Sequence, residues 1–119
     1  MPTSLDRSRT LAFHRQSGRC FYCKLPIWLD DVAAFRARYS LSVEHARLRQ
    51  CTAEHLVARQ DGGGNGRENI AAACPVCNRR RHLRRRPPSP LQHQQRVMAR
   101  IQNGRWLPRV LLEKLRRIS

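Results

Sequence analysis

Two CxxC pairs frame the residues of this chain that could perform chemistry. The pairs are Cys20–Cys23 and Cys74–Cys77, and two such pairs can supply four thiolates to one tetrahedral Zn²⁺ ion. Cys51 is the fifth cysteine, and we expect it to be a packed, unligated thiol because the other four already complete a site. Four buried thiols without metal are the alternative, which two matched pairs in so small a chain disfavour. The sequence therefore predicts a structural zinc ion.

Polar residues lie between the two pairs and directly after the second. Glu54 and His55 precede a glycine-rich segment, Asn69 follows it, and Asn78 comes immediately after Cys77. Phosphodiester cleavage needs a divalent cation at the phosphoryl oxygen and a neutral imidazole that takes a proton from the attacking water. Each residue taken alone has an ordinary structural explanation, but their joint order within the cysteine frame favours a hydrolytic centre.

A second polar pair supports this interpretation from helical geometry. Asn78 and His82 are four positions apart, so on a helix they lie one above the other on the same face. His82 has an alternative role, because a histidine inside an arginine run can also contact a phosphate.

This order of residues resembles the zinc-bound CxxC…CxxC branch of the HNH endonuclease family. The resemblance implies four catalytic positions: Glu54 and Asn78 as metal ligands, His55 as the general base, and Asn69 as the residue that holds the loop and orients the base. Some members carry a further metal ligand one helical turn later, where this chain has His82. The implied cofactors are the structural Zn²⁺ and a catalytic divalent cation such as Mg²⁺, Mn²⁺ or Ni²⁺.

The chain departs from the family pattern in two places and repeats part of it in a third. Ala58 stands where the family often has proline, and Glu54 stands where aspartate is commoner. A second Glu-His dipeptide, Glu44-His45, lies ten residues upstream of Glu54-His55. It lacks a following glycine-rich loop and an asparagine at the same distance, so we expect it to play no catalytic part.

The expected fold is α+β: a small zinc-stabilised ββα-metal domain, treble-clef-like, with additional N- and C-terminal helices. Residues 1–86 would form the nuclease domain, and residues 87–119 a proline-rich break and a helical extension. The sequence assigns no function to residues 25–50 or 91–119. The expected elements, in chain order, are a helix over 5–16, a knuckle at 19–24, a helix within 30–49, a strand from 51, a loop at 61–66, a return strand from 69 to 74, and helices over 75–83, 91–103 and within 105–119.

The charge balance predicts a polyanionic partner. The chain carries 24 lysines and arginines against 8 acidic residues, a formal charge of +16, and only Lys24 and Lys114 are lysine. Arginine favours bidentate phosphate contacts, so the partner is most simply nucleic acid. The resemblance to HNH nucleases implies that this partner is DNA, expected to be double-stranded. Six arginines follow the second cysteine pair: Arg79, Arg80, Arg81, Arg84, Arg85 and Arg86. We expect them to bind the phosphate backbone, which carries no sequence information.

Two rival functions stay open at this point. One is a non-catalytic zinc module that binds nucleic acid, and the other is an HNH nuclease that acts on RNA. No stretch of the sequence is apolar for long enough to cross a membrane, and the N-terminus lacks a hydrophobic segment of the signal-peptide type. The expected location is therefore the cytoplasm, where thiols stay reduced and CxxC pairs bind metals.

Overall fold

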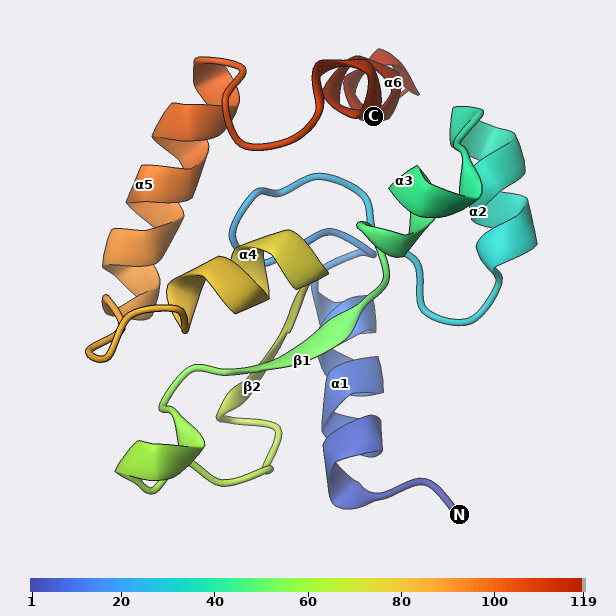
Figure 1. The fold of residues 1–119 in the computed structure, drawn as a ribbon. Coiled ribbons are helices and arrows are strands. Elements are labelled where there is room, and N and C mark those ends of the chain that lie inside the picture. The colour runs from blue at the N-terminus through green and yellow to red at the C-terminus, as the bar shows by residue number, and fades with distance from the viewer. Residues whose placement is uncertain (119) are drawn as a thin grey trace.

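The computed structural model describes residues 1–118, and Figure 1 shows a two-stranded hairpin surrounded by helices. This mixed content confirms the α+β class. The elements in chain order are α1 (Ser4–Arg15), α2 (Val32–Tyr39), α3 (Val43–Arg47), β1 (Thr52–His55), a 3₁₀ turn (Arg59–Asp61), β2 (Ile70–Ala73), α4 (Pro75–Arg81), α5 (Pro90–Gln102) and α6 (Arg109–Ile118).

The hairpin is the centre of the fold. Strands β1 and β2 are antiparallel, with a register that runs from Thr52 opposite Ala73 to His55 opposite Ile70. All four residues of β2 are buried, because α1 packs along the hairpin (Figure 1). The outer edge of β2 is paired in part by a side chain that follows α1. The amide of Gln16 accepts from Ala72 N at 3.0 Å and donates to Ala72 O at 2.8 Å, so these buried backbone groups stay paired.

The first cysteine pair sits in a knuckle that is attached to the hairpin. Phe21 N donates to Ala72 O at 2.8 Å, and Cys20 N donates to Leu25 O at 3.0 Å. Lys24 adopts a left-handed conformation with φ of 64°, which closes the turn. The second pair begins α4, where Cys74 is the N-cap and a proline follows at the first helical position. The knuckle and the start of α4 thereby meet at the end of the hairpin.

Residues 30–49 form two helices where the sequence predicted one. Asp31 caps α2 as expected, with its side chain accepting from Ala34 N at 3.0 Å. Ser40 then takes a left-handed conformation with φ of 57°, which ends α2. Ser42 begins α3 by accepting from His45 N at 3.0 Å. The left-handed backbone of Ser40 and the side-chain cap of Ser42 therefore divide the segment into two helices.

The C-terminal extension packs on the same core as the cysteines. Its buried side chains include Val97, Ile101, Trp106 and Leu111, which belong to one hydrophobic cluster with the four paired cysteines. Helix α5 begins with a capping box on Ser89. The predicted boundary between residues 86 and 87 stays a prediction. Within residues 1–118, no helix combines the length and apolar character needed to cross a membrane.

Candidate metal centre and active site

The four paired cysteines form a metal-binding cluster. Their sulfur atoms all lie within 4.8 Å of one another, and each cysteine is at most 1% exposed. Zn²⁺ binds thiolates at about 2.3 Å, so tetrahedral geometry separates the sulfurs by about 3.8 Å. The observed spacing fits such an ion. The prediction that these cysteines, Cys20, Cys23, Cys74 and Cys77, are placed to bind a metal is confirmed.

Backbone amides of helix α4 and its N-cap donate to two of the sulfurs. Cys74 N lies 3.3 Å from Cys20 Sγ, and Cys77 N lies 3.4 Å from Cys74 Sγ. The first turn of a helix has free N–H groups, and the second cysteine pair occupies that turn. The helix start therefore supplies two of the hydrogen bonds that a cluster of thiolates requires.

Side chains from two distant segments donate to the other two sulfurs. Arg49 Nη2 lies 3.4 Å from Cys23 Sγ, and Trp106 Nε1 lies 3.2 Å from Cys77 Sγ. Arg49 precedes β1 and Trp106 belongs to the C-terminal extension, the two regions without an expected role. Each of the four sulfurs thus accepts a hydrogen bond from one N–H group. The sequence did not predict the two side-chain donors, Arg49 and Trp106.

Arg49 brings a positive charge to the interior beside the cluster. Its side chain is fully buried, and Nε donates to Pro26 O at 2.9 Å. Burial acts to lower the pKa of the guanidinium, but the neighbouring thiolates, led by Cys23, raise it above the usual range. The charge is therefore retained. Because a Cys₄ site with Zn²⁺ has a net charge of about −2, a buried arginine offsets part of it.

Cys51 lies outside this cluster. Its side chain is 3% exposed, and burial raises the pKa of its thiol to about 11. A thiol of that pKa stays protonated at neutral pH and is a poor metal ligand and nucleophile. This placement agrees with the expectation of a packed thiol.

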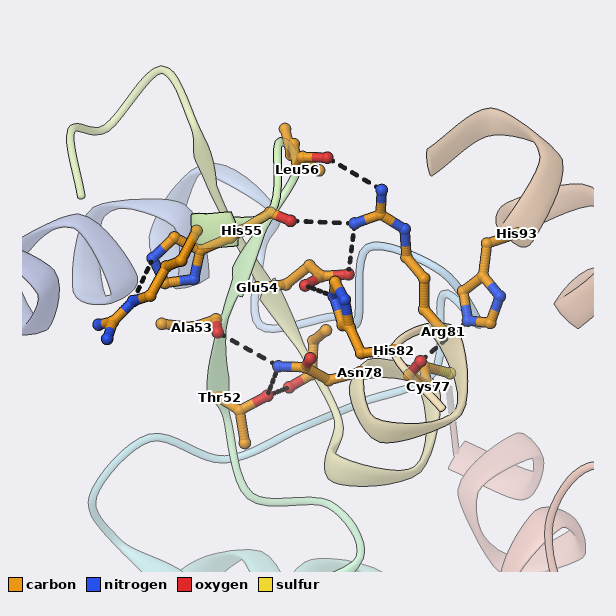
Figure 2. Close-up of polar contacts among 12 residues, drawn as sticks. Thr52, Ala53, Glu54, His55, Leu56, Cys77, Asn78, Arg81, His82 and His93 are labelled. Carbon is orange, nitrogen blue, oxygen red and sulfur yellow. Dashed lines mark hydrogen bonds and ion pairs between the residues drawn. The ribbon is translucent and has the colours of Figure 1, made fainter. Parts of the chain in front are cut away.

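Glu54 is a buried carboxylate with partners on both oxygens (Figure 2). The hydroxyl of Tyr22 donates to Oε2 at 2.7 Å, and Arg81 Nη1 donates to the same oxygen at 3.2 Å. The other oxygen, Oε1, lies 2.8 Å from His82 Nε2. Burial and then the charge of Glu54 raise the pKa of Tyr22, so the phenol keeps its proton and remains a donor. Oε2 is held by the protein, and Oε1 faces the histidine.

The Glu54–His82 pair fits two adjacent ligands of a divalent cation. Ligands at about 2.1 Å from Mg²⁺ in octahedral geometry are about 3 Å apart when they meet at a right angle, close to the observed 2.8 Å. Asn78 lies on the same side of β1, where its Nδ2 donates to Thr52 Oγ1 at 3.0 Å and Ala53 O at 3.2 Å. Within residues 1–118 its Oδ1 accepts no hydrogen bond, so that oxygen is available to a cation.

Asn78 and His82 share one side of α4, as their spacing predicted, although the helix itself ends one residue earlier. Arg81 is the last helical residue and His82 is the C-cap, with φ of −95° and ψ of 7°. Both side chains still reach β1, through Ala53 and Glu54 respectively. The proximity of His82 to Glu54 strengthens its place among the candidate ligands.

His55 lies on the other side of β1 from Glu54 (Figure 2), because successive side chains of a strand alternate. Its Nε2 is 2.9 Å from Asn65 Oδ1 and 3.4 Å from Arg59 Nε. The structure therefore brings Glu54 and His82 together but gives the His55 ring separate partners. The upstream His45 lies within the short helix α3, outside the hairpin.

Asn69 bonds to two segments of the loop between the strands, and among the described residues it makes no hydrogen bond to His55. Its side chain accepts from Val57 N at 2.8 Å and donates to Val57 O at 3.0 Å and Gly64 O at 2.9 Å. The loop is tight at Gly63, where a Cβ atom would collide with the Val57 carbonyl. The asparagine that contacts His55 is Asn65. In the sequence it stands among glycines and cannot be told from an ordinary turn residue.

Two of the six arginines in the run, Arg80 and Arg81, make contacts within the protein. Arg81 is 4% exposed, and it donates to the carbonyl oxygens of His55, Leu56 and Pro88 as well as to Glu54. Its guanidinium is enclosed by protein, which corrects the expectation that this residue contacts nucleic acid. Arg80 donates to Trp106 O at 2.9 Å, and its guanidinium lies 4.6 Å from the centre of the Trp106 ring. The remaining four, Arg79, Arg84, Arg85 and Arg86, are exposed.

An open pocket lies next to the site. It lies between the loop after β1 and the end of α4, and its lining includes Arg59, His82, Arg84 and Arg85. Arg59 contacts the His55 ring and His82 contacts Glu54. The pocket therefore carries the side chains of three arginines, Arg59, Arg84 and Arg85, and it is lined by one neighbour of His55 and one neighbour of Glu54.

A comparison with known families agrees with this geometry. The profile of the HNH endonuclease family matches residues 20–84, more than half of the 119-residue chain. No curated protein and no solved structure matches the chain. The matched range contains both cysteine pairs, the hairpin and α4. This chain belongs to the HNH endonuclease family.

Proposed function

We propose that this protein is a metal-dependent endonuclease that hydrolyses DNA phosphodiester bonds with weak sequence preference. The observation that supports it most strongly is the pair of Glu54 Oε1 and His82 Nε2, 2.8 Å apart beside an arginine-lined pocket. A buried carboxylate with one oxygen held by protein donors and the other turned to an imidazole is suited to a divalent cation.

The proposal assigns two metals to separate sites. Zn²⁺ in the cysteine cluster is structural, because four thiolates close its coordination sphere. A second divalent cation, such as Mg²⁺, Mn²⁺ or Ni²⁺, is held by Glu54, His82 and the free Oδ1 of Asn78. Its chemical contribution is to stabilise negative charge on the phosphoryl and leaving oxygens.

The protein supplies the remaining chemistry through His55. Its imidazole takes a proton from a water molecule, the water oxygen forms a bond to phosphorus, and the ester bond to the leaving oxygen breaks. The exposed arginines around the pocket hold the phosphates in place. Asn69 keeps the loop closed through its bonds to Val57 and Gly64, which maintains the position of the strand end that bears His55.

The exposed arginines also support a substrate with a continuous phosphate backbone. Arg84 and Arg85 line the pocket, and Arg79 and Arg86 are also exposed. Contacts of arginine with phosphates are independent of base sequence. We assign double-stranded DNA as the substrate, and RNA is the outcome that the same assay distinguishes.

A second candidate function is a non-catalytic module that binds nucleic acid. The observation in its favour is that Glu54 already has three partners, Tyr22, Arg81 and His82, an arrangement that also satisfies a purely structural carboxylate. Such a module would keep the zinc cluster and the arginines and would bind no second cation.

Cleavage by the purified zinc-loaded protein decides between these functions. Plasmid, linear DNA and RNA are each incubated with and without Mg²⁺, Mn²⁺ or Ni²⁺. Replacing His55 by alanine should lower the DNA cleavage rate by about 10²–10⁴-fold and leave zinc content and DNA affinity unchanged. His45→Ala, in the upstream Glu-His pair, is the matched control and should cleave at the parent rate.

Variants of the proposed cation ligands give a different pattern. Glu54→Ala, Asn78→Ala and His82→Ala should raise the concentration of Mn²⁺ needed for half-maximal cleavage, and high Mn²⁺ should restore part of the rate. Preferential cleavage of RNA would move the substrate assignment to RNA. If the parent protein cleaves nothing with any of the three cations while binding DNA, the non-catalytic module is the correct function.

A further inference from the structure

Asn65 is the polar partner of the proposed base, and no motif of the sequence pointed to it. Its Oδ1 lies 2.9 Å from His55 Nε2, a good hydrogen-bond distance. Asn65 belongs to the glycine-rich loop between β1 and β2, four positions before Asn69. The contact therefore joins the loop tip to the end of strand β1.

The chemistry of this contact determines where the imidazole carries its proton. An amide oxygen only accepts hydrogen bonds, so Nε2 must be the protonated nitrogen when it faces Oδ1. The neutral ring then has its lone pair on Nδ1. Within residues 1–118 no group forms a hydrogen bond with Nδ1, so that atom is free to accept a proton from water.

Arg59 is the other side chain at the same nitrogen, and it does not alter this conclusion. Its Nε lies 3.4 Å from His55 Nε2, and a guanidinium N–H can only donate. Nε2 cannot donate to Asn65 and accept from Arg59 at once, and the shorter contact is the one to Asn65. Arg59 is exposed and lines the open pocket, where it can turn to a phosphate.

The backbone of Asn65 is fixed by the N-terminal helix. Ser8 on α1 is 6% exposed, and its hydroxyl donates to Asn65 O at 2.7 Å. Helix α1 itself packs along the hairpin. Ser8 therefore bonds to the backbone of Asn65, while Asn69 bonds to the neighbouring Gly64 and to Val57. These hydrogen bonds support the loop segment that carries the Asn65 amide to His55.

We propose that Asn65 is a positioning residue that holds His55 in the Nε2–H tautomer, and that Ser8 of helix α1 anchors it. This inference rests on the proposed function, because the orientation of His55 matters to catalysis only if His55 is the base. Helix α1 lies before residues 20–84, which match the family. The inference gives this helix a role in positioning the base. An N-terminal helix outside the motif thus supports the catalytic imidazole through a single loop residue.

The test measures the tautomer directly. Protein labelled with ¹⁵N-histidine is prepared with zinc bound, and the ring nitrogens of His55 are identified by comparison with His55→Ala. The parent should show Nε2 protonated and Nδ1 unprotonated at mildly alkaline pH. Asn65→Ala should give a mixture of both tautomers, and Asn65→Asp, which keeps an acceptor oxygen, should restore the parent spectrum. Asn103→Ala, at the end of α5, is the matched control and should leave it unchanged.

Cleavage kinetics complete the test. Misplacing a catalytic group by about 1 Å can cost about 10²-fold in rate, so Asn65→Ala should lower kcat by about 10–100-fold with little change in KM for DNA. Ser8→Ala should change kcat in the same direction by a smaller factor, since Asn69 still holds the loop. Zinc content and thermal midpoint of both variants should stay near the parent values.

The two readouts separate this inference from the proposed function. The inference is overturned if the parent spectrum shows Nδ1 protonated, or if Asn65→Ala leaves both the tautomer and kcat unchanged. The proposed function still stands in that case, provided that the parent cleaves DNA and His55→Ala does not. A parent that never cleaves overturns the function, and with it any catalytic role of Asn65. Loss of the single tautomer together with loss of kcat in Asn65→Ala, reversed in Asn65→Asp, establishes the inference.

Discussion

The hydroxyl of Tyr22 lies 2.7 Å from Oε2 of Glu54, so a residue inside the first CxxC pair holds the buried carboxylate of the proposed catalytic site. Tyr22 stands between Cys20 and Cys23. A metal that shapes this knuckle therefore also sets the position of the phenol. The first cysteine pair and the Glu54–His82 pair are linked by one side chain.

Replacing Tyr22 by phenylalanine should weaken the catalytic cation site without loss of zinc. A hydrogen bond to a charged group contributes about 1.5–3 kcal/mol, and its removal leaves Arg81 as the single donor to Oε2 among the described residues. Calorimetric titration with Mn²⁺ should show a raised Kd. Tyr39→Phe, at a buried tyrosine in α2, is the control with unchanged Mn²⁺ affinity. An unchanged Kd in Tyr22→Phe would mean that Oε2 needs no second donor.

Removal of the structural metal should unfold the domain. The four cysteines are part of the hydrophobic core, and metal binding in small domains of this kind is coupled to folding. Cys74→Ser should lose zinc and the helical circular dichroism signal, and a strong chelator should have the same effect on the parent. Cys51→Ser, at a buried cysteine outside the cluster, should retain one zinc per chain. A folded, zinc-loaded Cys74→Ser would refute the structural role.

Replacing Arg49 by methionine should loosen the zinc site. The side chain of methionine fills similar space but removes the N–H donor to Cys23 and the buried positive charge beside the thiolates. Loss of one partner from a buried ion pair costs about 3–5 kcal/mol. The variant should release zinc faster to a colorimetric chelator and unfold at lower denaturant concentration. Arg47→Met, at an exposed position of α3, is the matched control with parent behaviour in both measurements.

The exposed arginines after α4 should supply affinity that depends on salt. Replacing Arg84, Arg85 and Arg86 by alanine together should reduce the slope of log Kd against log salt by about 0.9 for each phosphate that the variant no longer neutralises. Fluorescence anisotropy with a DNA duplex at several salt concentrations measures the slope. An unchanged slope would show that these three side chains point away from DNA. Arg105→Ala, at an exposed position in the loop before α6, serves as the matched single-charge control.

Arg81→Ala should behave differently from its exposed neighbours. Its guanidinium pairs with Glu54 and three carbonyl oxygens inside the protein, so its removal leaves a buried carboxylate without its cation. We expect a loss of about 3–5 kcal/mol in the free energy of unfolding, measured by urea denaturation. The salt dependence of DNA binding by the folded fraction should match the parent, and a reduced slope would place Arg81 on DNA after all.

Local features of the sequence were sufficient for the zinc cluster and the frame around it. The CxxC spacing, the proline after Cys74 and the glycines between the strands each determine the conformation of a few neighbouring residues. The common face of Asn78 and His82 follows from helical periodicity in the same way. Short-range spacing therefore predicted the hairpin, α4 and the four metal ligands.

Contacts between distant segments depended on the tertiary structure. Nothing local distinguishes Arg81 from the arginines around it, yet the position of α4 over β1 buries this one against Glu54. Arg49 and Trp106 donate to the thiolates from opposite parts of the chain, and Asn65 meets His55 because the loop folds back on β1. Residue types and their spacing determined which groups could react or bind metal. The packing of helices on the hairpin decided which partners hold those groups, because these hydrogen bonds join residues that are distant in sequence and close only in space.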